Sequence, residues 1–194
     1  MLTKPIIKLL SATMTIAVGL SQGLTTLASL PPTNTPLFIL ERSNNKNQVI
    51  YEMVGGQNNF LKPAPIHPFW RMLAKDGHVE SLTPYENRKV YGVSVVDKKR
   101  ETLKFVVKAL PKYPITVAID PKTKKPYATI HVMGQDQRLK KIFLQLGGGL
   151  TPSVESINIQ SLSPQNNRIN QITLSQAKNG KWKETSRSAE NTSY

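Results

Sequence analysis

Short runs in which apolar and polar residues alternate with a period of two dominate the sequence between residues 37 and 174. The runs are rich in Val, Ile, Thr and aromatic residues, and turn signals separate them. Because successive side chains of a strand point to opposite faces, this pattern is typical of strands with one buried face. The sequence therefore predicts an all-β fold, mainly antiparallel, a barrel or sandwich of about 8–10 short strands.

The alternation also predicts which face of a strand is buried. Leu103, Phe105 and Val107 share one face of a candidate strand, and Lys104 and Lys108 share the other. A shift of one residue would bury the lysines, so the pattern sets the register. The candidate strands span residues 37–42, 48–54, 66–73, 90–97, 101–109, 115–120, 127–133, 138–146, 154–160 and 168–174.

One short helix is expected near residues 83–89. Thr83 offers an N-cap hydroxyl, Pro84 suits the first helical position, and Glu86 stands where a capping box needs a carboxylate. The helix must be short, because residues 91–93 already have strand character.

The first 28 residues have the layout of a secretory signal peptide. Lys4 and Lys8 precede an apolar run, and small residues favour cleavage after Ala28. This predicts an exported protein, periplasmic or extracellular. The alternative is a retained N-terminal membrane anchor, because residues 9–30 carry no charge and could span a bilayer of about 30 Å. Several Ser, Thr and Gln side chains make that segment a poor lipid-facing helix, which favours cleavage.

The chain is expected to have four parts. A signal peptide at 1–28 and a Pro-rich lead-in at 29–36 precede a single β domain at 37–175, and a polar flexible tail occupies 176–194. Asn, Ser, Lys and Thr dominate the tail, which has few apolar residues to bury. No transmembrane span is expected after cleavage. The chain has no Cys, which excludes disulfides, thiol nucleophiles and thiolate zinc sites.

Three segments carry a family resemblance. They read LFILERSNNKNQVIYEM at residues 37–53, IHPFWRM at 66–72 and SLTPYENRKVYGV at 81–93. Together they resemble DUF4833, a family of bacterial exported proteins with a domain of unknown function, and a looser similarity continues to about residue 160. The resemblance implies export and an all-β domain. It implies no reaction, ligand or catalytic residue.

Positive charge is concentrated in one stretch of the chain. The formal net charge is +14, and residues 98–141 hold twelve basic and three acidic residues. Such a stretch attracts anions. The residues expected to bind an anionic surface are Lys98, Lys99, Arg100, Lys104, Lys108, Lys122, Lys124, Lys125, Arg138, Lys140 and Lys141.

Export limits the partners of these basic residues to anionic lipid headgroups or acidic polysaccharide. Few aromatic side chains lie among them, so specific nucleic-acid binding is not expected. The alternative is that the lysines are solvated and keep sheet edges from pairing with other molecules. The sequence leaves both interpretations open and does not predict an oligomeric state.

A second group of polar residues could line a ligand pocket. If His67 and Arg71 point inward, they lie at its floor; if Trp70 fills the core instead, they point outward. The Asn-rich segment at 42–47 is either a pocket rim or a hairpin turn. The candidate ligand-binding residues are Arg42, Asn45, Lys46, Tyr51, His67 and Arg71.

No segment has the pattern of a known catalytic motif, and the sequence names no catalytic residue. His67, His78 and His131 are too widely spaced for a local metal site, so neither a metal nor a cofactor is expected. The leading hypothesis is a non-enzymatic exported binding module that associates with an anionic envelope surface or polysaccharide. The alternative is a small-ligand carrier or hydrolase with a pocket that involves His67, Arg71 and residues 42–47.

Overall fold

The computed structural model describes residues 36–55, 60–132, 134–148, 153–164, 168–176 and 182–190. Within these ranges the fold is all-β with one short helix, as predicted. The elements are β1 (Phe38–Arg42), β2 (Asn45–Met53), β3 (Ile66–Arg71), β4 (Val79–Ser81), α1 (Pro84–Lys89), β5 (Val93–Lys98), β6 (Thr102–Val107), β7 (Ile115–Ile119), β8 (Pro126–Val132), β9 (Gln135–Leu146), β10 (Val154–Leu162), β11 (Ile169–Gln176) and β12 (Trp182–Glu190).

Ten of these strands match the candidate strands, and β4 and β12 were not expected. β4 is only three residues long and has no periodicity to detect. β12 pairs with β11 inside the segment 176–194, where a flexible tail was expected. Ladder hydrogen bonds between backbone groups need no apolar alternation, so the polar sequence did not indicate this strand.

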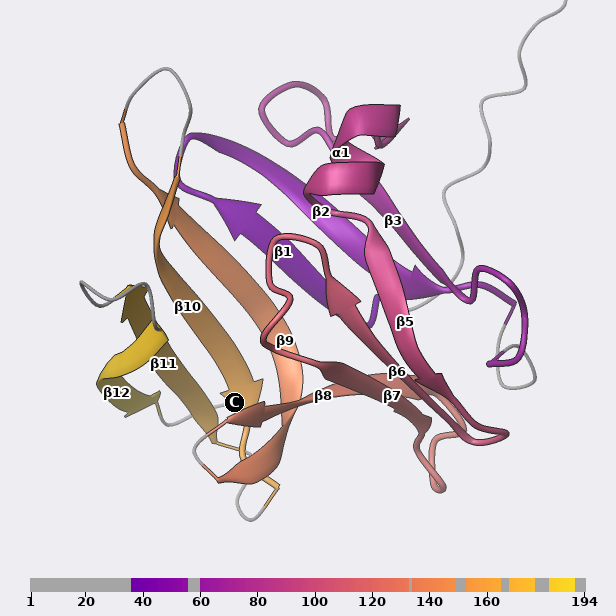
Figure 1. The fold of residues 1–194 in the computed structure, drawn as a ribbon. Coiled ribbons are helices and arrows are strands. Elements are labelled where there is room, and N and C mark those ends of the chain that lie inside the picture. Colours follow the sequence, from indigo (N-terminus) through magenta and orange to yellow (C-terminus); the bar gives the residue numbers. More distant parts are fainter. Residues whose placement is uncertain are drawn as a thin grey trace, which may run out of the picture. The chain divides into compact units, whose positions relative to one another are not determined.

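The long strand β9 joins two limbs of one sheet (Figure 1). β10 pairs along one edge of β9. The other edge is shared: β8 pairs antiparallel with residues 135–138, and β1 pairs parallel with residues 141–144. The first limb continues from β1 to β2, β3 and β4, and the second from β8 to β7, β6 and β5. The mixed sheet curls into a half-barrel.

A β-bulge lies where the two limbs separate. Gln160 of β10 pairs with Lys141 and Ser161 pairs with Leu139, so Lys140 is the extra residue of β9. Leu139 and Ile142 consequently both point into the core. In a strand with strict alternation, Leu139 and Ile142 would point to opposite faces, but the bulge shifts the alternation by one residue.

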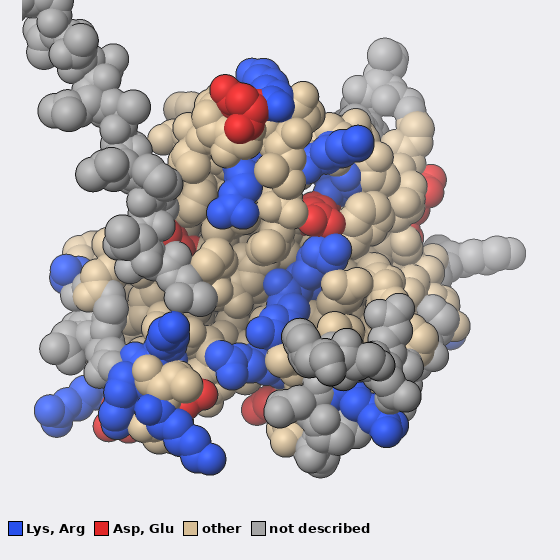
Figure 2. Space-filling model, turned by 180° about the vertical axis from the view of Figure 1, so that it is seen from behind, with Lys and Arg blue, Asp and Glu red and all other residues tan. Residues whose placement is uncertain are grey.

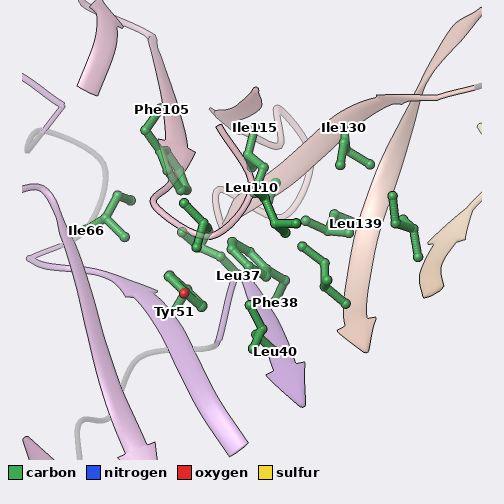
Figure 3. Packing of buried hydrophobic residues seen from close by; sticks show 14 of the residues in the cluster. Leu37, Phe38, Leu40, Tyr51, Ile66, Phe105, Leu110, Ile115, Ile130 and Leu139 are labelled. Atoms are coloured by element: carbon green, nitrogen blue, oxygen red, sulfur yellow. The ribbon is translucent and has the colours of Figure 1, made fainter. Parts of the chain in front are cut away.

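The core lies between the two limbs (Figure 3). The ring of Phe38 in β1 stacks on Tyr51 in β2, with centroids 4.4 Å apart. It also lies 6.4 Å from the ring of Phe105 in β6. Ile115 and Ile130 extend the same cluster on the second limb, and all five side chains are fully buried. Phe38 therefore contacts aromatic side chains of both limbs.

The predicted capping box is present at the start of α1. The hydroxyl oxygen of Thr83 accepts from the backbone N–H of Glu86 at 3.2 Å, and the backbone N–H of Thr83 donates to the Glu86 carboxylate at 2.9 Å. The chain leaves the helix through Gly92. A Cβ there would lie 1.7 Å from the carbonyl oxygen of Asn87, so only glycine fits.

Thr83→Ala is expected to lower the free energy of unfolding by about 1 kcal/mol, because it removes the oxygen that accepts from the first turn. Urea denaturation followed by circular dichroism measures this change. Thr83→Ser keeps the hydroxyl and serves as the control. Equal stability of Thr83→Ala and the parent protein would contradict the capping role.

The predicted signal peptide at 1–28 lies outside the described residues, and so does the lead-in up to residue 35. The boundaries expected for the four parts of the chain therefore stay predictions. Among the residues that the structure describes, no helix is long and apolar enough to cross a membrane.

Candidate functional site

The orientation of β3 separates the two alternatives for His67 and Arg71. Ile66 and Trp70 enter the core and are at most 5% exposed. The side chain of His67 points to the other face and is 52% exposed. Arg71, half-buried, shares that face by alternation. These two residues therefore lie on the face opposite the core, because Ile66 and Trp70 occupy the interior.

His67 lines a cavity of about 380 Å³ between the edges of the two limbs. Its Nδ1 lies 3.2 Å from Oε1 of Glu52, a buried carboxylate that is not among the predicted site residues. The sequence signal for this buried carboxylate is its position between two apolar residues, Tyr51 and Met53. Arg71 does not line this cavity.

Arg42 and Lys46 line a different cavity, of about 450 Å³, together with Asn45 and other residues of the β1–β2 turn. His67 and residues 42–46 therefore line different cavities, and Arg71 lines neither of these two.

The side chain of Arg42 packs among aromatic rings. Its guanidinium carbon lies 4.7 Å from the ring centroid of Trp70 and 5.7 Å from that of Tyr91. Nη1 donates to the Tyr91 hydroxyl at 2.7 Å, whereas Nε is buried without a hydrogen-bond partner. The Tyr51 hydroxyl donates to the carbonyl of Tyr91 at 2.8 Å, and burial raises the pKa of Tyr51 well above its ordinary value. Arg42 and Tyr51 thus connect the first limb to the segment after α1.

The asparagines of the β1–β2 segment satisfy backbone groups. Oδ1 of Asn45 accepts from the backbone N–H of Asn47 at 3.0 Å. Oδ1 of Asn47, which is buried, accepts from the N–H of Ala74 at 2.9 Å. These bonds are those of a hairpin turn and its neighbouring loop. Lys46 is exposed beside them.

Most of the predicted basic residues come together at one end of the second limb. β6 begins opposite the end of β7, since Thr102 pairs with Ala118. The β5–β6 and β7–β8 turns therefore lie side by side. Arg100 and Lys124, one from each turn, line the same cavity of about 500 Å³. We call this group the basic end; it consists of Lys98, Lys99, Arg100, Lys122, Lys124, Lys125, Arg138 and Lys140.

The remaining three basic residues lie elsewhere. Lys104 is exposed on β6 and Lys108 follows the end of that strand. Lys141 points toward the first limb, where its Nζ lies 3.2 Å from Glu41 Oε2. Figure 2 shows Lys and Arg side chains gathered at the lower left, over the turns of the second limb, and in a band across the middle of this face.

Two acidic residues at the basic end form loose ion pairs. Nζ of Lys99 lies 3.5 Å from Asp97, and Nη1 of Arg138 lies 3.8 Å from Asp120. Backbone N–H groups in the β7–β8 turn donate to Asp120 and lower its pKa, so this carboxylate is ionised at neutral pH. Exposed pairs of this kind contribute little and are screened by salt. The basic end keeps an excess of positive charge.

His67 lies in β3, His78 directly before β4, and His131 in β8. Within the described ranges, no group of three or more His, Asp or Glu side chains could hold a metal ion. The ring of His78, directly before β4, lies between two carboxylates. Its Nδ1 contacts Asp76 of the preceding loop, and its Nε2 lies 2.6 Å from Oε1 of Glu80 in β4.

The pKa of His78 is raised above its ordinary value by its hydrogen bonds, first to Asp76 and then to Glu80. The contacts favour the protonated ring, so their stabilisation is complete below the ordinary pKa and is lost as pH rises through the raised value. Asp76→Asn is expected to lower the pKa of His78, as measured by an NMR titration of its ring protons. Glu80→Gln is the matched variant for the second contact. Unchanged titration midpoints in both variants would contradict the assignment.

The described part of the chain belongs to the class of all-β domains. Its mixed sheet divides at β9 into two limbs, and the basic end lies on the second limb. The chain belongs to the family DUF4833, a domain of unknown function, whose family model matches residues 38–171. This match confirms the resemblance found in the sequence, and it contains both limbs and the basic end. Neither the curated proteins nor the solved structures include a match to the chain.

Proposed function

We propose that the protein is an exported, non-enzymatic binding module whose basic end associates with anionic lipid headgroups of the cell envelope. The observation that carries this proposal is the meeting of the β5–β6 turn, the β7–β8 turn and the β9 bulge at one end of the second limb. Eight Lys and Arg residues from three separate parts of the sequence gather there.

The grouping matters because the attraction of an anionic surface acts over a short range. The Debye length is about 10 Å at 0.1 M salt, so only side chains near the surface contribute. Each Lys or Arg that reaches an anionic membrane contributes about 1 kcal/mol. A cluster at one end of the molecule can contact the surface with several side chains at once.

An exposed apolar side chain beside the basic end favours lipid over polysaccharide. Leu61 is 66% exposed. It follows Phe60, which lines the same cavity as Arg100 and Lys124. Nζ of Lys98 donates to the carbonyl oxygen of Lys62 at 2.6 Å, which holds this loop against the end of β5. Moving a leucine side chain from water into the interfacial region of a bilayer lowers the free energy, and an acidic glycan provides no such region.

Binding to vesicles tests the proposal. The full chain is expected to bind phosphatidylcholine vesicles that contain about 30 mol% phosphatidylglycerol, and to lose about tenfold or more of its affinity between about 0.1 M and 1 M salt. A form that begins at Ser29 separates the basic end from the apolar segment at 9–30. No binding of this form at low salt would overturn the proposal. Binding to an acidic polysaccharide without binding to vesicles would replace the lipid by a glycan.

A further inference from the structure

The fork between the two limbs contains a small cavity of about 210 Å³. It lies where β8 and β1 separate along the shared edge of β9. Its walls come from the start of β1, the start of β8 and the bulge of β9. Three basic side chains line it: Lys125, Arg138 and Lys140. We call this cavity the fork site.

Local structure constrains the three basic residues of the fork site. Lys140 is the extra residue of the bulge, and bulges redirect side chains relative to the regular pleat. The guanidinium carbon of Arg138 lies 5.2 Å from the ring centroid of Tyr127 on β8, a cation–π contact that restricts its orientation. The carbonyl of Lys125 accepts from the backbone N–H of Asp120 at 2.9 Å, which closes the β7–β8 turn.

Positive charge is crowded in this cavity. Partial desolvation of this exposed side chain, and then the charge of Arg138, lower the pKa of Lys140 below its ordinary value. Asp120 is the acidic residue next to these basic side chains, with its Oδ2 3.8 Å from Nη1 of Arg138. An oxyanion between the cations would relieve their repulsion and accept hydrogen bonds from each of them.

We propose that the fork site binds a phosphate group. The planar guanidinium of Arg138 can donate two parallel N–H bonds to phosphate oxygens, and the ammonium groups of Lys125 and Lys140 can donate to the others. The cavity is smaller than the 300–1,000 Å³ or so of sites for drug-sized ligands, and therefore suits a single phosphate rather than a larger molecule. The phosphate could belong to a lipid headgroup, and in that case the inference rests on the proposed function. The other source is free phosphate.

Titration with inorganic phosphate and with glycerol phosphate tests the fork site directly. In the full chain, the NMR signals of the Arg138 side chain and of the Lys140 ammonium group are expected to shift with phosphate and not with chloride at equal ionic strength. Lys140→Gln is expected to weaken phosphate binding about tenfold or more, and Lys140→Arg to retain most of it. Lys104→Gln, an exposed lysine on the same limb, is the matched control.

Equal responses to phosphate and chloride would overturn the fork site, and so would equal losses in Lys140→Gln and Lys104→Gln. The folding of each variant is checked by its amide NMR spectrum, and Lys125→Gln repeats the test if Lys140→Gln does not fold.

Vesicle binding of the same variants separates this inference from the proposed function. If phosphatidylglycerol vesicles bind Lys140→Gln less tightly than Lys104→Gln, the lipid headgroup is the source of the phosphate. If free phosphate binds and vesicles do not, the fork site stands and the proposed function fails. If vesicles bind in a salt-dependent way but free phosphate does not bind, and Lys140→Gln equals Lys104→Gln, the proposed function stands and the fork site is overturned.

Discussion

Phe38→Ala is expected to lower the free energy of unfolding by about 3–5 kcal/mol, the usual loss for a fully buried aromatic residue. The ring of Phe38 stacks on Tyr51 and reaches Phe105 across the core. Its removal leaves a cavity between the limbs, which cannot collapse without moving β1 away from β9 and β2. Equilibrium denaturation in urea, with the midpoint and slope compared between variants, measures the loss.

Leu61→Ala is the control for this substitution, because Leu61 is apolar but largely exposed. Its effect on stability is expected to stay within about 0.5 kcal/mol. Phe38→Leu keeps most of the volume and should lose less than Phe38→Ala. Similar stabilities of Phe38→Ala and Leu61→Ala would contradict the packing described between the limbs.

Replacing Lys122, Lys124 and Lys125 with Gln is expected to weaken binding to anionic vesicles by roughly 100-fold, at about 1 kcal/mol for each charge removed from the contact surface. The three lysines occupy one turn of the basic end. Vesicle co-sedimentation at constant ionic strength measures the change. The residual binding should also depend less steeply on salt, because fewer charges face the membrane.

A triple variant of the first limb and its helix provides the matched control. Lys46, Lys75 and Lys89 are exposed and lie outside the basic end, so their replacement by Gln removes the same net charge. This control is expected to bind vesicles almost as tightly as the parent protein. Equal losses in the two triple variants would show that net charge, and not the basic end, causes the binding.

Much of the fold was predictable because strand alternation is a local property. The inner residues Leu103, Phe105 and Val107 are fully buried as expected, since their polar neighbours could not occupy the core. The capping box at Thr83 and Glu86 was equally local, because all its donors and acceptors lie within one turn of helix.

The candidate sites were less predictable, because they depend on which strands become neighbours. The sequence left the direction of His67 and Arg71 open, and the burial of Trp70 decided it. The pairing of Glu52 with His67 joins neighbouring strands, and the sequence signals only the carboxylate within an apolar run, not its partner. The bulge at Lys140 is equally invisible in the alternation, since an extra residue looks like an ordinary exposed lysine.

The sequence by itself determined the all-β class, the inner face of the strand with Leu103, Phe105 and Val107, the short capped helix and the concentration of positive charge between residues 98 and 141. Only the tertiary structure decided that β9 is shared by two limbs, that two distant turns lie side by side, and that Lys125, Arg138 and Lys140 line one cavity. The physical reason is that side-chain patterning acts within a strand. The backbone hydrogen bonds between neighbouring strands are the same for every sequence, so they cannot determine which strands pair. The choice of partner depends on how the whole core packs.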